Sequence, residues 1–201
     1  LLLYLLFLIV VAGHAFFSKS IQDTKALWLN VPPVPSESGM TAFALGDRQF
    51  AYRLTGMMLQ NLGNTGGRSL SLAKYDYDKV GEWLLLADQF DPRSNFIPLL
   101  ASFYFSATPN DEDLTPIIDY LATVGLRTDA QKWRWLAQAV YLARFRQGDL
   151  DRALDLSQAL AGHWREGRPA WLKQMPALIL TAQGEKEAAY NILMRTLKEE
   201  G

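Results

Sequence analysis

The sequence predicts an all-α protein: one N-terminal transmembrane helix, followed by an α-α superhelix of about four helical hairpins. The first observation is the run LLLYLLFLIVVAGHAFF at residues 1–17, which contains no Asp, Glu, Lys or Arg. The second is an internal repeat, because Trp135-Leu136 recurs as Trp171-Leu172 and Gly148-Asp149 recurs as Gly184-Glu185 after the same 36 residues. Each copy has an apolar run, a Gly with an acidic residue, and a second apolar run.

Length and composition limit the classes of protein. The 201 residues, 49% hydrophobic and 20% charged, suffice for one buried domain and an appendage. The net charge of −1 shows no basic excess of the kind that neutralises phosphates, so we expect no nucleic-acid partner. Cysteine is absent, which excludes disulfides, Cys-based metal sites and thiol catalysis.

Residues 1–17 are interpreted as a transmembrane anchor that binds the lipid bilayer, since their length lies at the lower edge of what crosses a membrane. The alternative is a secretory signal peptide, with Gly13 and Ala15 as the small residues before a cleavage site. The chain begins with Leu and not Met, so we expect a short, basic piece to precede it.

Residues 18–40 are interpreted as a juxtamembrane segment and a Pro-rich linker, with Trp28 at the membrane interface. The stretch VPPVPSESG at residues 31–39 has three prolines, which favour extended backbone. Two readings stay open: a spacer between membrane and domain, or an ordered strap along the domain through Val31, Val34 and Met40.

Residues 41–201 are predicted to form the helical repeat domain, because apolar residues recur at three- and four-residue spacing. Gly, Pro and polar turns divide the pattern into helices. The expected hairpins pair residues 41–63 with 75–90, 95–106 with 114–124, 129–147 with 149–163, and 170–183 with 185–200. The first helix is rich in apolar residues, so we expect the linker or a partner to cover it.

Residues 75–197 resemble tetratricopeptide repeats, whose units are helix pairs of about 34 residues with a Gly-Asp turn and an Ala soon after it. The resemblance rests on matching small, turn and apolar positions. These are Ala137, Gly148, Asp149, Ala153 and Leu156 in the best unit, Gly184, Glu185, Ala189 and Leu193 in the last, and the helix-ending Asp91-Pro92. The resemblance implies a right-handed array of stacked hairpins whose concave face binds a peptide or a protein surface.

We expect no catalytic, cofactor or metal site. His14 and His163 are the only histidines, no GxSxG turn is present, and the acidic clusters lack the spacing of an EF-hand. An enzyme is therefore not predicted.

Partner binding is assigned to an aromatic and Arg-rich band, because Trp, Tyr and Arg dominate interface hot spots. The candidates are Trp133, Arg134, Arg144 and Arg146, with Trp28 near the membrane. Trp135 and Trp171 hold equivalent repeat positions and are expected to pack one hairpin on the next. The alternative for the band is cation-aromatic contacts within the domain.

Two functions remain. The first is a non-catalytic, membrane-anchored scaffold, an accessory subunit or assembly factor of a larger membrane protein complex. The second is a tethered or exported domain that binds a peptide or small ligand alone. We expect a single-pass membrane protein of the bacterial inner membrane with the repeat domain on the periplasmic side, in contact with subunits of a membrane protein complex or with a peptide segment.

Overall fold

A computed structural model describes residues 2–21, 31–65, 68–128 and 131–200. The regular structure in these ranges is helical except for the antiparallel two-residue strands β1 (Asn64–Thr65) and β2 (Arg68–Ser69), so the all-α class is confirmed. The α-helices are α1 (Leu2–Ile21), α2 (Glu37–Phe43), α3 (Arg48–Gln60), α4 (Tyr77–Phe90), α5 (Phe96–Leu99), α6 (Thr115–Gly125), α7 (Trp133–Tyr141), α8 (Leu150–Gly162), α9 (Trp171–Gln183) and α10 (Lys186–Glu200). Shorter helical segments are η1 (Leu72–Lys74), η2 (Leu100–Tyr104), η3 (Phe105–Ala107), η4 (Asp111–Leu114) and η5 (Leu142–Gln147).

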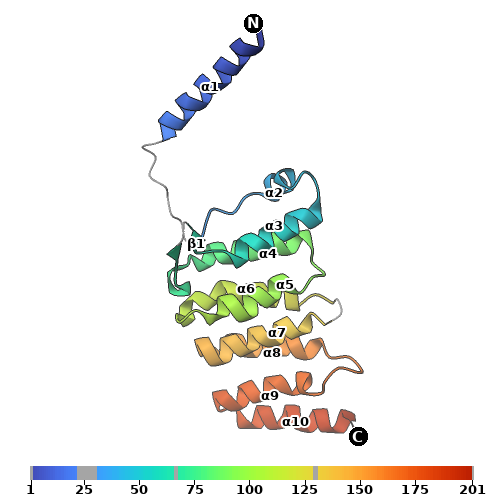
Figure 1. Ribbon diagram of the computed structural model, residues 1–201. Coiled ribbons are helices and arrows are strands. Elements are labelled where there is room, and N and C mark those ends of the chain that lie inside the picture. The colour runs from blue at the N-terminus through green and yellow to red at the C-terminus, as the bar shows by residue number, and fades with distance from the viewer. Residues whose placement is uncertain (1, 22–30, 66–67, 129–130, 201) are drawn as a thin grey trace.

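Helix α1 is long and apolar enough to cross a membrane, judged by length and composition. Its apolar stretch Leu3–Ser20 has no part buried against the rest of the chain, and Figure 1 shows it apart from the helical stack. The helix extends past residue 17, where the sequence analysis ended the anchor. Membrane orientation stays a prediction.

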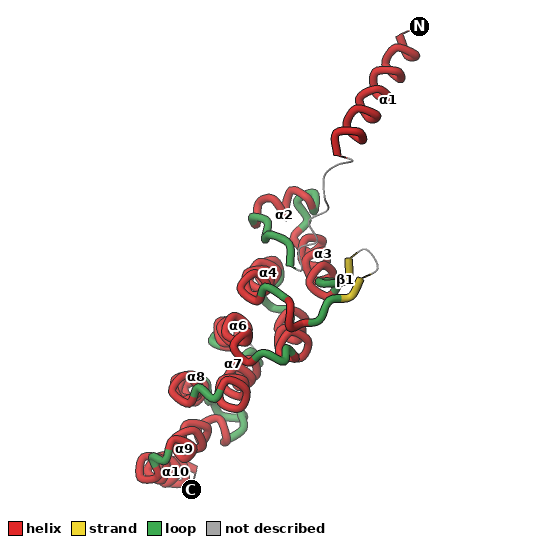
Figure 2. The backbone as a smooth tube through the Cα atoms, turned by 90° about the vertical axis from the view of Figure 1, so that its left-hand side faces the viewer, coloured by secondary structure: helices red, strands yellow, loops and turns green. Residues whose placement is uncertain are grey.

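The other long helices form four hairpins that follow one another in a two-layer stack (Figures 1 and 2). We call the first helices of the hairpins the A layer: α3, the run α5–η2–η3, the run α7–η5, and α9. The second helices, α4, α6 with η4, α8 and α10, form the B layer. Contacts run from α3 to α4, α4 to α6, α6 to α7, and onward in chain order to α10. The tetratricopeptide-like superhelix itself stays a prediction.

The first hairpin differs from the expected single helix over residues 41–63. The chain forms two helices, α2 and α3, separated where Leu45 has φ 56° and Gly46 has φ 83°. This left-handed backbone ends α2, and the Asp47 carboxylate starts α3 by accepting from the backbone N–H groups of Gln49 and Phe50. The hydroxyl of Ser36 caps the N-terminus of α2 by accepting from the backbone N–H of Gly39.

The Pro-rich segment from residue 31 is an ordered strap. Val31 is buried in the core, and Val34 packs against it. The indole Nε1 of Trp83 in α4 donates to the Pro32 carbonyl at 2.9 Å. The spacer reading is therefore wrong for this part of the linker, which belongs to the body of the domain.

Turns and close helix contacts position the layers. Gly148 and Gly184 have φ 68° and 90° and end the first helices of the third and fourth hairpins, which confirms both Gly turns. Between the second and third hairpins, a Cβ added to Gly125 would lie 2.3 Å from the backbone nitrogen of Leu136. This glycine lets α6 of the B layer approach α7 of the A layer.

Candidate interaction surface

Exposed large apolar side chains lie on all four A-layer helices, whereas in the B layer they are confined to Leu85 and to the last helix, α10. In α3, the run α5–η2 and the run α7–η5 they recur at helical spacing, so each of these helices presents one stripe. The buried positions of these helices contact the B layer and the neighbouring hairpins. The A-layer apolar side chains more than 40% exposed are Phe50, Met57, Phe96, Leu99, Phe103, Tyr141, Phe145 and Leu178, and we call the surface that they form the A face.

Two π-helical segments carry the most exposed aromatic side chains of this face. Segment η2 carries Phe103, which is 69% exposed, and η5 carries Phe145, which is 61% exposed. The Tyr141 and Phe145 rings lie 5.2 Å apart. A π-helical turn holds an extra residue and is frequent at functional sites. The same irregularity thus occurs at the same end of two successive A-layer helices.

Charged residues are also distributed unequally between the two layers. The A-layer helices contain cations and no acid: Arg48, Arg53, Arg134, Arg144, Arg146 and Lys173. The B-layer helices of the first three hairpins carry two cations, Lys79 and Arg152, against nine acids. These acids are Asp78, Glu82, Asp88, Asp111, Glu112, Asp113, Asp119, Asp151 and Asp155.

Three of the A-layer cations have no acidic partner. Among the residues that the structure describes, Arg53, Arg134 and Arg144 make no ion pair. The Arg134 guanidinium carbon lies 5.5 Å from the Trp133 ring centroid, and that of Arg144 lies 4.6 Å from the Phe145 ring centroid. These contacts match the cation-aromatic alternative and orient the two groups, while leaving their charges uncompensated.

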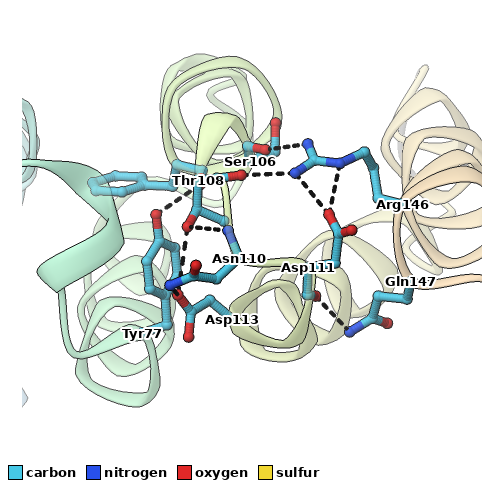
Figure 3. A network of polar contacts seen from close by, with 9 residues as sticks. Tyr77, Ser106, Thr108, Asn110, Asp111, Asp113, Arg146 and Gln147 are labelled. Carbon is cyan, nitrogen blue, oxygen red and sulfur yellow. Dashed lines mark hydrogen bonds and ion pairs between the residues drawn. The ribbon is translucent and has the colours of Figure 1, made fainter.

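Arg146, by contrast, joins the second and third hairpins (Figure 3). Its guanidinium donates to the Asp111 carboxylate from Nε at 2.9 Å, to the Ser106 carbonyl at 2.9 Å and to the Thr108 carbonyl at 2.7 Å. Gln147 adds a hydrogen bond to the Thr115 hydroxyl at 2.9 Å. Because a helix end leaves carbonyl groups without intrahelical partners, Arg146 satisfies the end of η3, where the second hairpin lacks a Gly-Asp turn. Its donors are thus used inside the stack.

The remaining residues of the predicted band have different positions. Trp133 is buried at 8% exposure, and its ring packs edge-on against Trp171 at 5.8 Å between the third and fourth hairpins. Trp135 donates from Nε1 to the Asn95 side chain at 3.0 Å. Trp28 lies outside the described residues. Arg134 and Arg144 are the two predicted residues that contribute to the A face.

The apolar part of this face was not predicted from the sequence. Helical spacing of apolar residues was interpreted as a core pattern, whereas the A-layer helices carry exposed apolar side chains as well as buried ones. The absence of acids from the A-layer helices was the signal that could have identified it.

Within the described ranges, no group of three or more His, Cys, Asp or Glu side chains could hold a metal ion. A polar cavity lined by Asp111, Gln147, Asp149 and Arg152 lies at the loops between the helices and not on the A face. Comparisons with protein-family models, curated proteins and solved structures found no match to this chain.

Proposed function

We propose that this protein is a non-catalytic, membrane-anchored scaffold, an accessory subunit or assembly factor that binds a subunit of a membrane protein complex through the A face. One observation carries the proposal: exposed apolar side chains on all four A-layer helices lie together with arginines that have no acidic partner. Contiguous exposed apolar surface marks interaction sites, and aromatic and Arg side chains dominate their energetics.

Helix α1 supplies the other half of the proposal. A transmembrane segment keeps the stacked hairpins beside the bilayer, where the local concentration of other membrane proteins is high. The resemblance to tetratricopeptide arrays supports the same role, because such arrays bind protein surfaces along one face. We place the chain as a single-pass protein of the bacterial inner membrane with the stack on the periplasmic side.

The alternative, a tethered domain that binds a peptide or small ligand alone, needs a concave site that encloses its ligand. The A-face side chains are instead spread over four successive helices, and Tyr141, Met57 and Leu178 are each about half exposed. Such a broad, shallow surface suits a protein partner better than a small molecule.

The test is affinity purification of the tagged full chain from membranes solubilised in mild detergent, with mass spectrometry of the copurifying proteins. The A-face variant is Phe103→Glu/Phe145→Glu. The matched control is Leu85→Glu/Leu197→Glu, which places two acids at exposed apolar positions of the B layer. Both variants are first checked for wild-type helix content.

We expect the wild-type chain and the control to retain a stoichiometric set of integral membrane proteins that the A-face variant loses. If the A-face variant kept the same set, the partner would bind elsewhere and the proposal would be wrong. If the wild-type chain brought down no membrane protein, the scaffold role itself would be rejected.

A further inference from the structure

The A face has an ordered pattern of charge along the stack. Arg53 lies on α3 at one side, and Arg134 and Arg144 lie on the run α7–η5 at the other. The helical run between them, Phe96–Ala107, contains no charged residue and exposes apolar side chains, Phe103 most of all. A partner that crosses the face therefore meets cationic, apolar and cationic surface in turn.

The three arginines make no ion pair among the residues that the structure describes. Among the helices of the first three hairpins, the acids are on the B layer and the A layer has none, while Asp47, Asp76, Asp91 and Asp149 lie at helix ends. A basic partner would be repelled, and an acidic one would be attracted and brought into register. Guanidinium groups also present fork-shaped donors that match carboxylates, which favours Arg over Lys for this task.

We infer that the A face binds an acidic amphipathic segment of the partner protein. Apolar side chains of the segment pack on Phe103 and its neighbours, and carboxylates on either side pair with Arg53 and with Arg134 and Arg144. The inference rests on the proposed function and adds the chemistry of the partner.

Two other occupants fit the same observations less well. Segments that bind anionic membranes by charge carry about four to eight clustered cations, whereas three unpaired arginines are spread here over two helices. A second copy of the chain would offer its acidic surface from the B layer, so that contact would be head-to-tail and would not close into a symmetric dimer.

The test measures peptide binding by the full chain in nanodiscs of zwitterionic lipid, with empty nanodiscs as the blank. Three fluorescent synthetic helices share one apolar stripe of Leu and differ in their polar residues, which are Glu, Gln or Lys. The A-face variant is Arg53→Glu/Arg134→Glu/Arg144→Glu. The control, Lys186→Glu/Arg195→Glu/Lys198→Glu, makes the same change of net charge at exposed positions of α10.

We expect the wild-type chain to bind the Glu peptide more tightly than the Gln and Lys peptides, and more weakly as salt rises. The A-face variant should lose about tenfold or more in affinity for the Glu peptide, because three ion pairs are replaced by repulsion. The α10 control should stay within about twofold, since it changes long-range attraction alone.

Several outcomes would overturn the inference. Equal losses in both variants would mean that net charge, and not this face, binds the peptide. Loss of binding of both the Glu peptide and the uncharged Gln peptide in nanodiscs that contain anionic lipid would mean that the A face docks on the bilayer, because the Gln peptide is not repelled by anionic lipid. Larger assemblies of the wild-type chain than of the A-face variant, measured by light scattering, would identify a second copy as the occupant.

The same variants separate this inference from the proposed function. If copurification depended on Phe103 and Phe145 but was unchanged by the triple Arg substitution, the scaffold role would stand and the acidic partner would be rejected. If copurification depended on neither set, both would fall.

Discussion

The A layer and the B layer are built by the same four hairpins, yet their surfaces differ in sign and in polarity. The A-layer helices have cations without acids and expose aromatic side chains, whereas the first three B-layer helices have mainly acids. Stability alone favours interspersed charges, because like charges on one surface repel. This segregation is the difference on which the proposed role of the A face as a partner-binding surface rests.

Asp88 is the exception among the B-layer acids, because it is buried between elements at 1% exposure. Its carboxylate pairs with Arg127 and accepts from the Tyr120 hydroxyl. The substitution Arg127→Met would leave a buried, unpaired carboxylate, which costs about 3–5 kcal/mol of the free energy of unfolding. Urea titration of the full chain followed by circular dichroism measures the loss.

The control for this prediction is Arg152→Met, which removes the partner of an exposed acid, Asp119. An exposed pair contributes less than about 1 kcal/mol, so the midpoint should hardly move. Equal shifts in the two variants would show that Asp88 is not different from the surface acids.

Gly125 tests the junction of the layers. In Gly125→Ala the new Cβ would lie 2.3 Å from the Leu136 backbone nitrogen, and backbone cannot yield as a flexible side chain does. We expect a loss of about 1–3 kcal/mol from overpacking, measured by the same titration. Gly162→Ala is the matched control, because nothing lies within 4 Å of its added Cβ. A harmless Gly125→Ala would mean that α6 and α7 are not held at this spacing.

The arginines of η5 provide a third comparison, within the A layer. Arg146→Ala removes hydrogen bonds to two carbonyl groups and an ion pair with Asp111, for an expected loss of about 1–2 kcal/mol. Arg144→Ala should change stability by less than about 0.5 kcal/mol, because Arg144 makes no ion pair among the described residues. Thermal unfolding of both variants measures these two changes in stability. If Arg144→Ala were the more damaging, Arg144 would be structural, and its place on the A face would lose its meaning.

The repeat in the sequence predicted most helices of the stack. The Gly-acid pairs at residues 148 and 184 locate turns because a left-handed position strongly favours Gly, and this preference is local. The break at Leu45 was not predicted, since a Leu with positive φ leaves no trace in an apolar pattern. The partner helix α4 of the same hairpin stabilises α3 through a hydrogen bond from Arg48 to the Gln89 carbonyl, which the sequence pattern does not show.

The candidate site was less predictable than the helices, because its residues are sorted by distant partners. Trp133 is buried by Trp171 of the next hairpin, and Arg146 bonds to carbonyl groups about forty positions earlier in the chain. Arg134 and Arg144 belong to the same aromatic and Arg-rich stretch of the sequence, but they make no ion pair with another hairpin among the described residues. Tertiary contacts thus decide which members of one aromatic and Arg-rich band remain at the surface.

His163 gives the smallest expected effect. It lies at the end of α8, where two arginines are an exception to the mainly acidic B layer. Burial lowers the pKa of its imidazole first, and the charges of Arg168 and Arg165 lower it further. Because the pKa of His163 is lower in the folded state than in the unfolded state, the contribution of its neutral imidazole to the free energy of unfolding is complete above the unfolded-state pKa. This contribution is lost as the pH falls through the folded-state pKa. Acidification from about pH 7 to about pH 5 should therefore lower the unfolding midpoint more in the wild-type chain than in His163→Gln, measured by thermal unfolding at each pH. An identical pH dependence in both chains would mean that the acids of the B layer offset the two arginines at this helix end.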